Sequence, residues 1–280
     1  MAENDDKHSG SRDDGSMRDI FAELSEAAMS DPDPVRRAQK QMQKPLPKRF
    51  YKQAGFAEHD EGGFLVTLDG RPVRTPARLL LTLPSAVTAE KTAAEWDAQA
   101  ETIDPATMPL TRLANTAIDG IAQDTQAVAE DVLRFAGTDL ICYRAGGPER
   151  LVERQSEEWD PVLDWAQAEL AARFVLAEGV MHVAQPRETL AAFGAALKAF
   201  TQPLDLAALH LATSLTGSAL IAMALAKGAL APDEAWEKAH LDENWNAELW
   251  GEDYEAAKRR ESRRRDFDAA AFVLLARRNG

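Results

Sequence analysis

The chain changes its hydrophobic period near residue 84. Between residues 48 and 84, apolar and polar side chains alternate, as in the run of Phe64, Val66 and Leu68, and this period is typical of strands with one buried face. Asp69-Gly70 is a tight-turn signal between two such runs. Residues 48–84 therefore predict a small antiparallel β domain, which needs another element to pack against because so few strands are not stable alone.

After Pro84 the pattern becomes helical. Ser85 is a suitable N-cap, and apolar residues recur at helical spacing from Leu151 to Leu170. A short strand is expected near 174–180. Further helices are expected at about 187–200, 204–227, 232–250 and 252–278.

These patterns predict an α+β fold in which a small N-terminal antiparallel β domain (48–84) is followed by a larger, mainly helical domain (85–280). Residues 1–47 are acidic, rich in Ser and Gly at first, and punctuated by proline before the β domain. Such a segment buries little apolar surface, so we expect a disordered tail.

One uncharged segment, residues 206–226, is long enough to cross a membrane. It also contains several hydroxyl-bearing residues and a histidine, and no basic cluster flanks it on one side. A helix that is apolar on nearly all sides belongs in the core of a large domain. We therefore expect a buried central helix and no stable membrane insertion.

Charge and cysteine content narrow the range of functions. A formal net charge of -14 makes nucleic-acid binding a poor hypothesis, and the basic run at 258–265 is interpreted as a solvated helix face. The single cysteine, Cys142, excludes an intrachain disulfide and is interpreted as a small buried hydrophobe, with a thiol nucleophile as the alternative. The acid-rich N-terminus lacks a signal core, so we expect a bacterial cytoplasmic protein. A mitochondrial matrix location requires a transit peptide missing from this chain.

The sequence lacks the common catalytic motifs. It contains no glycine-rich phosphate loop and no G-x-S-x-G turn. Its histidines, at positions 8, 59, 182, 210 and 240, show neither H-x-H nor H-E-x-x-H spacing. The sequence therefore offers no recognised catalytic or cofactor-binding motif, and we expect no metal site, because only two candidate ligands, His240 and Glu243, lie close together.

The densest chemistry lies in HLDENWNAELWGED, residues 240–253. On a continuous helix, Glu243 shares an apolar face with Trp236, Ala239, Ala247, Trp250 and Tyr254. A carboxylate on a buried face needs a partner. Three alternatives are open: a structural ion pair with His240, a functional acid at a protein interface, and a metal or catalytic pair with His240.

The same helix has a second apolar stripe, formed by Leu241, Trp245 and Leu249. A helix that is apolar on two opposite faces is either deeply buried or presents one face to a protein partner. Tryptophan is the residue most enriched in interface hot spots, so an interaction surface is one of the two interpretations.

Five segments occur in the order of a known family. They are LDGRPVRTP (68–76), AAEWDAQ (93–99), MPLTRLANTAID (108–119), WDP (159–161) and HLDENWNAELWGED (240–253). The chain resembles the alpha-proteobacterial and mitochondrial assembly chaperones of the F-type ATP synthase head, which bind the unassembled alpha subunit. The resemblance covers about residues 49–275 and implies a β domain, a helical domain, no catalysis and no cofactor. The implied partner is the alpha subunit.

The resemblance also implies site residues. The residues that match the N-terminal and connecting motifs are Asp69, Gly70, Arg71, Glu95, Trp96, Pro109 and Asp119. The residues that match the C-terminal motif, where the functional acid of the family lies, are Glu243, Glu248, Trp250 and Gly251. Whether that acid is Glu243 or Glu248 stays open, although the position of Glu243 on the apolar face favours it.

The candidates for client binding are Glu243, Glu248, Trp250, Trp245 and Trp236. Two alternative functions are an acid-site enzyme centred on Glu243 and His240, and a generic protein-binding adaptor. The enzyme requires a concave, polar-lined pocket at Glu243, whereas a chaperone requires a broad apolar surface.

Overall fold

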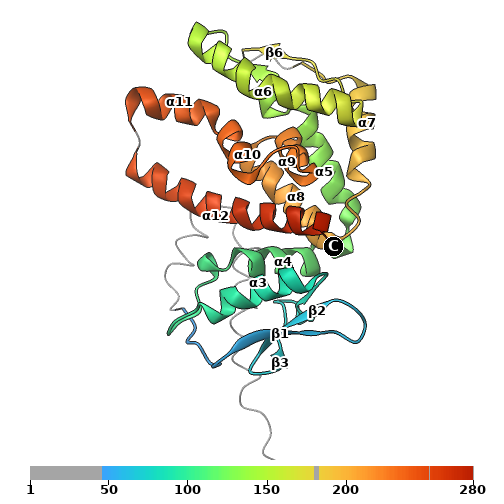
Figure 1. Cartoon of the computed structure of the whole chain (residues 1–280), viewed down its shortest axis with the longest axis vertical. Helices are drawn as coiled ribbons and strands as arrows, with labels where there is room; N and C mark the ends of the chain where they lie inside the picture. Colours follow the sequence, from blue (N-terminus) through green and yellow to red (C-terminus); the bar gives the residue numbers. More distant parts are fainter. Residues whose placement is uncertain (1–45, 180–182, 252, 280) are drawn as a thin grey trace, which may run out of the picture.

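The computed structural model of the chain describes residues 46–179, 183–251 and 253–279, so nearly all of the predicted tail (1–47) lies outside the described residues. An antiparallel sheet lies at one end of the molecule, and helices form the rest (Figure 1). The predicted α+β class, with an N-terminal antiparallel sheet before the helices, is confirmed.

The sheet is built around β2 (Phe64–Leu68), which pairs antiparallel with β1 (Ala54–Glu58), β3 (Arg71–Pro72) and β4 (Thr82–Leu83). The predicted turn at Asp69-Gly70 joins β2 to β3, and both residues have positive φ, 47° and 76°. Two consecutive positive φ values define the type of turn that Asp-Gly favours in hairpins.

A helix covers the sheet. In α3 (Ala86–Asp97), Ser85 is the N-cap, as predicted, and its side chain accepts a hydrogen bond from the backbone N–H of Thr88. The buried face of α3 includes Trp96 and packs on β1 and β2. The boundary between a β domain and a helical domain at residue 84 stays a prediction. In the structure, one continuous hydrophobic core joins the sheet, α3 and the later helices.

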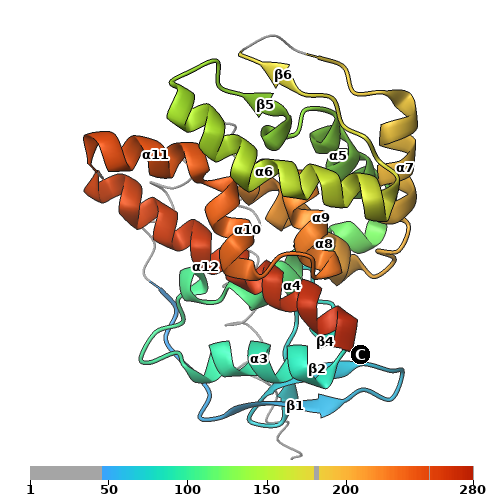
Figure 2. The same ribbon diagram turned by 45° about the horizontal axis from the view of Figure 1, so that its top comes forward.

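The helical part follows in layers above α3 (Figures 1 and 2). A two-residue strand, β6 (Ala177–Glu178), lies in the range where the sequence suggests one and pairs parallel to β5 (Tyr143–Arg144). The helices are α4 (Pro109–Asp119), α5 (Thr125–Gly137), α6 (Glu149–Leu170), α7 (Arg187–Leu197), α8 (Pro203–Thr216), α9 (Ala219–Lys227), α10 (Pro232–Ala239), α11 (Leu241–Trp250) and α12 (Tyr254–Ala276). Short 3-10 turns lie at Pro105–Thr107, Ile121–Gln123, Leu140–Cys142 and Arg277–Asn279.

The segment 206–226 is buried, as expected, but it does not form one helix. Gly217, in the left-handed conformation, ends α8, and the Ser218 side chain accepts a hydrogen bond from the N–H of Ile221 to begin α9. The two helices form the centre of the core. Among the described residues, no helix is both long enough and apolar enough to cross a membrane.

A buried carboxylate fixes the start of α9. Asp139, which follows α5, accepts hydrogen bonds from the backbone N–H of Leu220 (2.9 Å) and of Ile141 (3.3 Å). Burial raises the pKa of Asp139 to about 6, and the hydrogen bonds from Ser218 and the start of α9 oppose that rise. This side chain therefore joins the end of α5 to the core helix α9.

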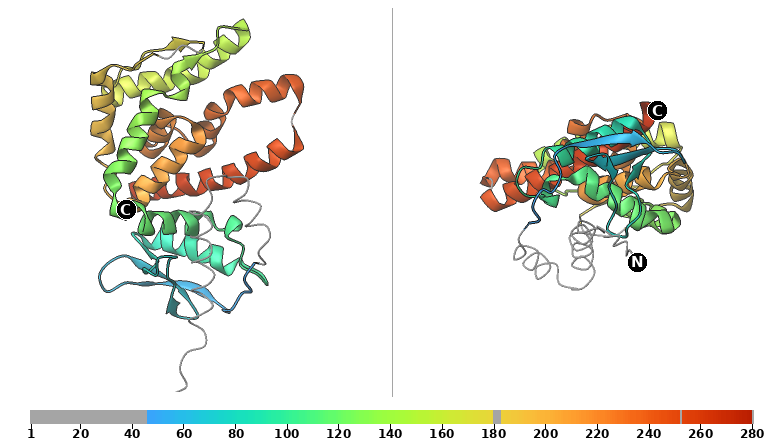
Figure 3. Two further views of the ribbon diagram at one scale, coloured as in Figure 1. Left: turned by 180° about the vertical axis from the view of Figure 1, so that it is seen from behind. Right: turned by 90° about the horizontal axis from the view of Figure 1, so that it is seen from below.

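Helix α12 lies across the long axis of the molecule (Figure 1). Its C-terminal half packs on α8, α9 and α4, and it also contacts α3 in the sheet layer (Figure 2). Arg277, just beyond its end, forms a 3.0 Å ion pair with the nearly buried Asp205 of α8. At the opposite end, α11 and the start of α12 form a hairpin that extends away from the body (Figures 1 and 3).

Candidate functional site

The helix that the sequence predicts at 232–250 is broken at His240. This residue has φ -108° and ψ 22°, which are outside the helical region, and it separates α10 from α11. Its buried ring stacks on Trp236 at 3.9 Å between centroids, and its Nδ1 lies 2.9 Å from the Trp236 carbonyl oxygen. Burial lowers the pKa of His240. The ring therefore occupies the corner between the two helices.

The break changes the environment of Glu243. Its side chain is 58% exposed, and its carboxylate lies 4.0 Å from His240 Nε2 and 3.9 Å from Arg263 Nη1. The expectation that Glu243 lies in the middle of a buried apolar face is wrong. The predicted face assumes one continuous helix through residue 240. In the structure α10 ends at Ala239, and α11 is a separate helix that starts at Leu241.

Because its two ion pairs are long and solvated, Glu243 contributes little to stability. We expect Glu243→Gln to change the free energy of unfolding by less than about 0.5 kcal/mol. Thermal unfolding of the purified variant is the measurement. Asp242→Ala is the comparison on the same turn: it removes the 2.8 Å hydrogen bond to buried Gln155 and should cost about 1 kcal/mol. A larger loss for Glu243→Gln than for Asp242→Ala would contradict this account.

Polar contacts attach α10 and α11 to α6. Arg154 Nη1 donates hydrogen bonds to both carboxylate oxygens of Glu248, at 2.9 and 2.8 Å. Lys238 Nζ donates to Glu158 Oε2 at 2.6 Å, and Trp159 Nε1 donates to the Lys238 carbonyl oxygen at 2.8 Å. Glu248 belongs to the family motif, whereas the sequence gives no indication that Arg154 contacts it.

The three tryptophans proposed for client binding occupy different environments. Trp236 is buried, where it packs on Phe267 and lies beneath the Arg264 guanidinium. Trp245 is half-buried. Trp250, the last residue of α11, is 84% exposed. Of the three, Trp250 therefore presents the most surface to a partner.

Glycine is required at the end of α11. Gly251 has φ 85° and ψ 164°, a conformation that is essentially restricted to glycine. Its N–H donates to the Ala247 carbonyl oxygen, and the chain then turns toward Asp253, whose side chain caps α12. This backbone explains why glycine suits the C-terminal motif at position 251.

The N-terminal motif residues serve the fold. Glu95 of α3 accepts hydrogen bonds from the N–H groups of Leu110 (2.7 Å) and Thr111 (2.8 Å) and from the Thr111 hydroxyl (2.9 Å). Pro109 occupies the first position of α4, so Glu95 caps that helix from a neighbouring element. Burial raises the pKa of Glu95 despite these bonds.

The other N-terminal motif residues anchor loops. The carboxylate of Asp69 accepts hydrogen bonds from the N–H groups of Lys52 and Gln53, which lowers its pKa. Asp119, at the end of α4, accepts a hydrogen bond from the N–H of Ala77 at 3.0 Å. Trp96 is buried against Tyr51, while Arg71 is exposed in β3.

The sequence and the overall fold are similar to those of known proteins. Residues 48–167 match the family model described as ATP12 chaperone protein. The crystal structure of Atp12 from Paracoccus denitrificans is 38% identical in sequence, with a TM-score of 0.75, and the match covers 82% of this chain and 97% of that chain. The chain belongs to the ATP12 chaperone family.

Two further proteins are similar to this chain. The crystal structure of the Atu1473 protein from Agrobacterium tumefaciens is 59% identical, with a TM-score of 0.82, and covers 93% of this chain and 97% of that chain. The mitochondrial protein atp12 of Schizosaccharomyces pombe is 26% identical over 224 residues, which are 74% of this chain and 76% of that protein. The family resemblance noted in the sequence is confirmed, and the family is one of chaperones, not enzymes.

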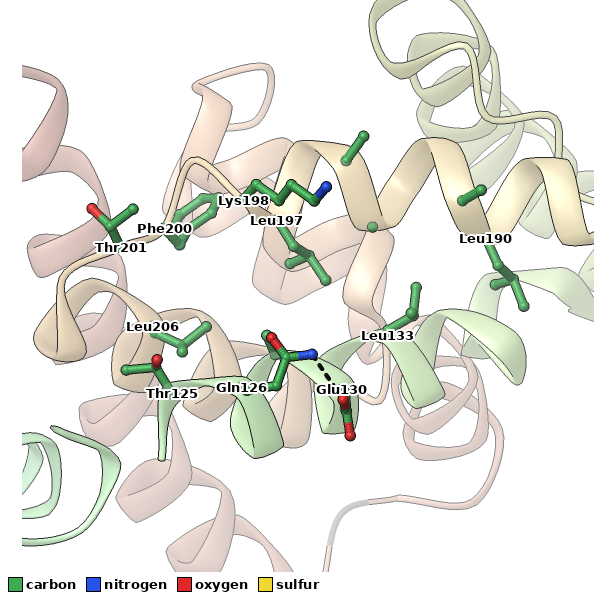
Figure 4. A pocket seen from close by; sticks show the side chains of 14 residues that line it. Thr125, Gln126, Glu130, Leu133, Leu190, Leu197, Lys198, Phe200, Thr201 and Leu206 are labelled. Atoms are coloured by element: carbon green, nitrogen blue, oxygen red, sulfur yellow. Dashed lines mark hydrogen bonds between the residues drawn. The ribbon is translucent and has the colours of Figure 1, made fainter. Parts of the chain in front are cut away.

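A groove in this ATP12 family member lies away from Glu243. It has a volume of about 590 Å³ and opens between α5, α7 and the start of α8 (Figure 4). Its lining includes Leu133, Leu190 and Phe200, with Glu130 hydrogen-bonded by Gln126 at the rim. No residue of α10 or α11 lines it, so it does not provide the polar pocket at Glu243 that the acid-site enzyme requires. Within the described ranges, no three His, Cys, Asp or Glu side chains group as a metal site.

Proposed function

We propose that this protein is an assembly chaperone of the F-type ATP synthase and that its client is the unassembled alpha subunit. The observation that carries the proposal is the match to Atp12 over 97% of that chain's length. The sequence motifs that resemble the F-type assembly chaperones support it. We place this activity in a bacterial cytoplasm, because the bacterial relatives are more similar (59% and 38% identical) than the mitochondrial one (26%).

The activity needs surface complementarity and no chemistry. A subunit that waits for its neighbour exposes a large apolar interface, which is prone to aggregate. A chaperone that binds this interface lowers the free concentration of the aggregation-prone form by mass action. Among the candidate client-binding residues, exposed Trp250 and exposed Glu243 are available for such contacts.

Co-expression with single ATP synthase subunits tests the proposal. We expect the alpha subunit to become soluble and to co-purify with the tagged protein. The beta subunit of the same enzyme serves as the control and should remain unbound. In cells, deletion of the gene should reduce membrane-bound ATPase activity and move the alpha subunit into the insoluble fraction. An alpha subunit that neither binds nor changes its solubility would contradict the proposal.

A further inference from the structure

Strand β1 is an edge of the sheet. It pairs with β2 on one side, and among the described residues no strand pairs with its other side. A free strand edge presents a row of backbone N–H and C=O groups, which another extended backbone matches along its whole length. The chemistry of this edge therefore indicates an extended polypeptide segment as its ligand.

Hydrogen bonds at the two ends of β1 fix which of its backbone groups face β2. The Asp69 N–H donates to the Gln53 carbonyl oxygen, and the His59 N–H donates to the Gly63 carbonyl oxygen, both at 2.9 Å. In an antiparallel pair, alternate residues of one strand bond to the same neighbour. The odd-numbered residues from 53 to 59 therefore bond to β2, and residues 54, 56 and 58 point their N–H and C=O groups outward.

The outward groups are largely free. The Ala54 N–H lies 3.4 Å from the carboxylate of Asp97, at the end of α3. Within the described ranges, no hydrogen bond satisfies the outward backbone groups of Phe56 and Glu58. The strand, AGFAE, contains no lysine or proline, and no bulge interrupts its register with β2, so it lacks these common devices that prevent edge strands from pairing.

Helix α3 covers the face of the sheet on which Phe56 lies (Figure 1). Phe56 is opposite Val66, which is fully buried, so the two side chains are on the same face. Phe56 is nevertheless 41% exposed, with its ring edge-on to that of Phe64 at 6.3 Å between centroids. An apolar side chain on an added strand would cover this ring, so the ligand has apolar side chains on the face toward α3.

The end of β1 is acidic. Glu58, Asp60 and Glu61 are exposed, and none of them forms an ion pair in the part of the chain that the structure describes. Opposite charges on neighbouring strands stabilise their pairing, and like charges oppose it. A lysine or arginine on the added segment therefore suits this end of the edge.

We propose that the free edge of β1 binds an extended segment of the unassembled client subunit by β-strand addition, with apolar side chains toward α3 and a lysine or arginine beside Glu58. This inference rests on the proposed function and adds a contact in the sheet layer, away from α11 (Figure 1). Chains that have not reached their final assembly expose unpaired strands of this kind, and pairing one of them protects it from aggregation.

A second copy of this chain fits the edge less well. Its own α3 would lie on the same side of the joined sheet, and α3 packs more extensively on β1 than on β2. Neighbouring strands are about 5 Å apart, whereas two packed helices need about 8–10 Å between their axes. A segment that carries no covering helix avoids this conflict.

Amide hydrogen exchange tests the pairing directly. Binding of the purified alpha subunit should slow exchange of the Phe56 and Glu58 amides about tenfold or more, because each gains a hydrogen-bond acceptor. The Gly55 and Ala57 amides are the internal control: they already face β2, so their exchange should change much less.

Two substitutions at one position separate the backbone from the side chain. Glu58→Pro and Glu58→Ala both remove the carboxylate, and only proline also removes the outward N–H. Glu58→Pro should therefore bind the alpha subunit about tenfold more weakly than Glu58→Ala. Thermal unfolding of both variants checks that the sheet is intact, and the exchange measurement on the wild type stands if the proline variant does not fold.

A charge reversal tests the basic residue on the ligand. Glu58→Lys should slow association several-fold at low salt, and the difference should shrink at high ionic strength. Glu169→Lys is the matched control, because Glu169 is an exposed acid on α6, at the other end of the molecule (Figure 1). That variant should associate at the wild-type rate.

The outcomes separate the two proposals. If the wild type does not bind the alpha subunit, the proposed function fails, and this inference fails with it. If it binds while exchange at Phe56 and Glu58 is unchanged, or if Glu58→Pro binds as Glu58→Ala does, the inference alone is overturned. A wild-type dimer that Glu58→Pro converts to a monomer would show that a second copy occupies the edge. Protection of these amides in the free monomer that is lost when residues 1–45 are deleted would show that the N-terminal segment of this chain occupies it. Either of these results also overturns the inference.

Discussion

Replacing Glu95 with alanine is expected to lower the free energy of unfolding by about 3 kcal/mol. The substitution leaves two backbone N–H groups at the start of α4 and the Thr111 hydroxyl without their acceptor. These groups lie between α3 and α4, where the sheet layer meets the helices, so water replaces the carboxylate incompletely. Urea unfolding measures the loss, and the melting temperature should fall by roughly 6 °C.

Glu90→Ala is the matched control for this prediction. Glu90 is an exposed acid on the same helix, so its loss should change stability by less than about 0.5 kcal/mol. Glu95→Gln should fall between the two, because one amide oxygen still accepts while the NH₂ group faces N–H donors. Equal effects of Glu95→Ala and Glu90→Ala would show that the cap does not stabilise the fold.

Replacing Asp139 with alanine is expected to cost about 3 kcal/mol. Its carboxylate is fully buried and accepts the N–H of Leu220, and the alanine variant leaves that donor unpaired inside the core. Burying the charged carboxylate is itself unfavourable, and this cost offsets part of the stability that its hydrogen bonds provide. Chemical unfolding at pH 7 measures it, and a variant as stable as the wild type would show that water reaches this site.

Asp139→Asn separates the charge from the hydrogen bonds. Because burial raises the pKa of Asp139 from 3.8 to about 6, the folded chain binds this proton more tightly than the unfolded chain. Protonation of Asp139 therefore increases the free energy of unfolding. This contribution is fully present below pH 3.8 and is lost as the pH rises through about 6. The stability of the wild type relative to Asp139→Asn should therefore fall by roughly 1 kcal/mol between pH 5 and pH 7.5. Parallel curves would contradict the raised pKa.

Local signals in the sequence predict much of the fold. The alternation through Phe64, Val66 and Leu68, the Asp-Gly turn and the Ser85 cap all depend on short-range chemistry, and the structure contains each of them. Gly217-Ser218 carried a similar signal, a helix-ending glycine followed by an N-cap serine. The long apolar run outweighed that signal, and one helix was predicted where there are two.

The corner at His240 could not be predicted in the same way. The ring of His240 is buried, stacks on Trp236 and lies within hydrogen-bond distance of its carbonyl oxygen, and Trp236 itself packs on Phe267 of α12, far along the chain. Once the period is interrupted, the helical faces computed across residue 240 no longer apply. For this reason the sequence pattern assigns Glu243 to an apolar face, whereas its side chain is exposed to solvent.

In the candidate site, too, the sequence indicates local properties but not contacts between distant residues. Glu248, Trp250 and Gly251 follow from the family motif, and the conformation of Gly251 is a local property. The partner of Glu248 is Arg154, which is 94 positions away in the sequence, and nothing near either residue indicates that they meet. Pairings of this kind depend on the tertiary arrangement of α6 and α11.

The distribution of tryptophans gives the molecule a built-in optical reporter. The chain has six tryptophans, all within the described residues: Trp96, Trp159 and Trp236 are buried, Trp165 and Trp245 are half-buried, and Trp250 is open to solvent. A water-soluble collisional quencher such as iodide therefore reaches Trp250 far more readily than the other five. The quenchable fraction of the native emission reports mainly on the C-terminal end of α11, so contacts made there can be followed in solution without attaching a dye.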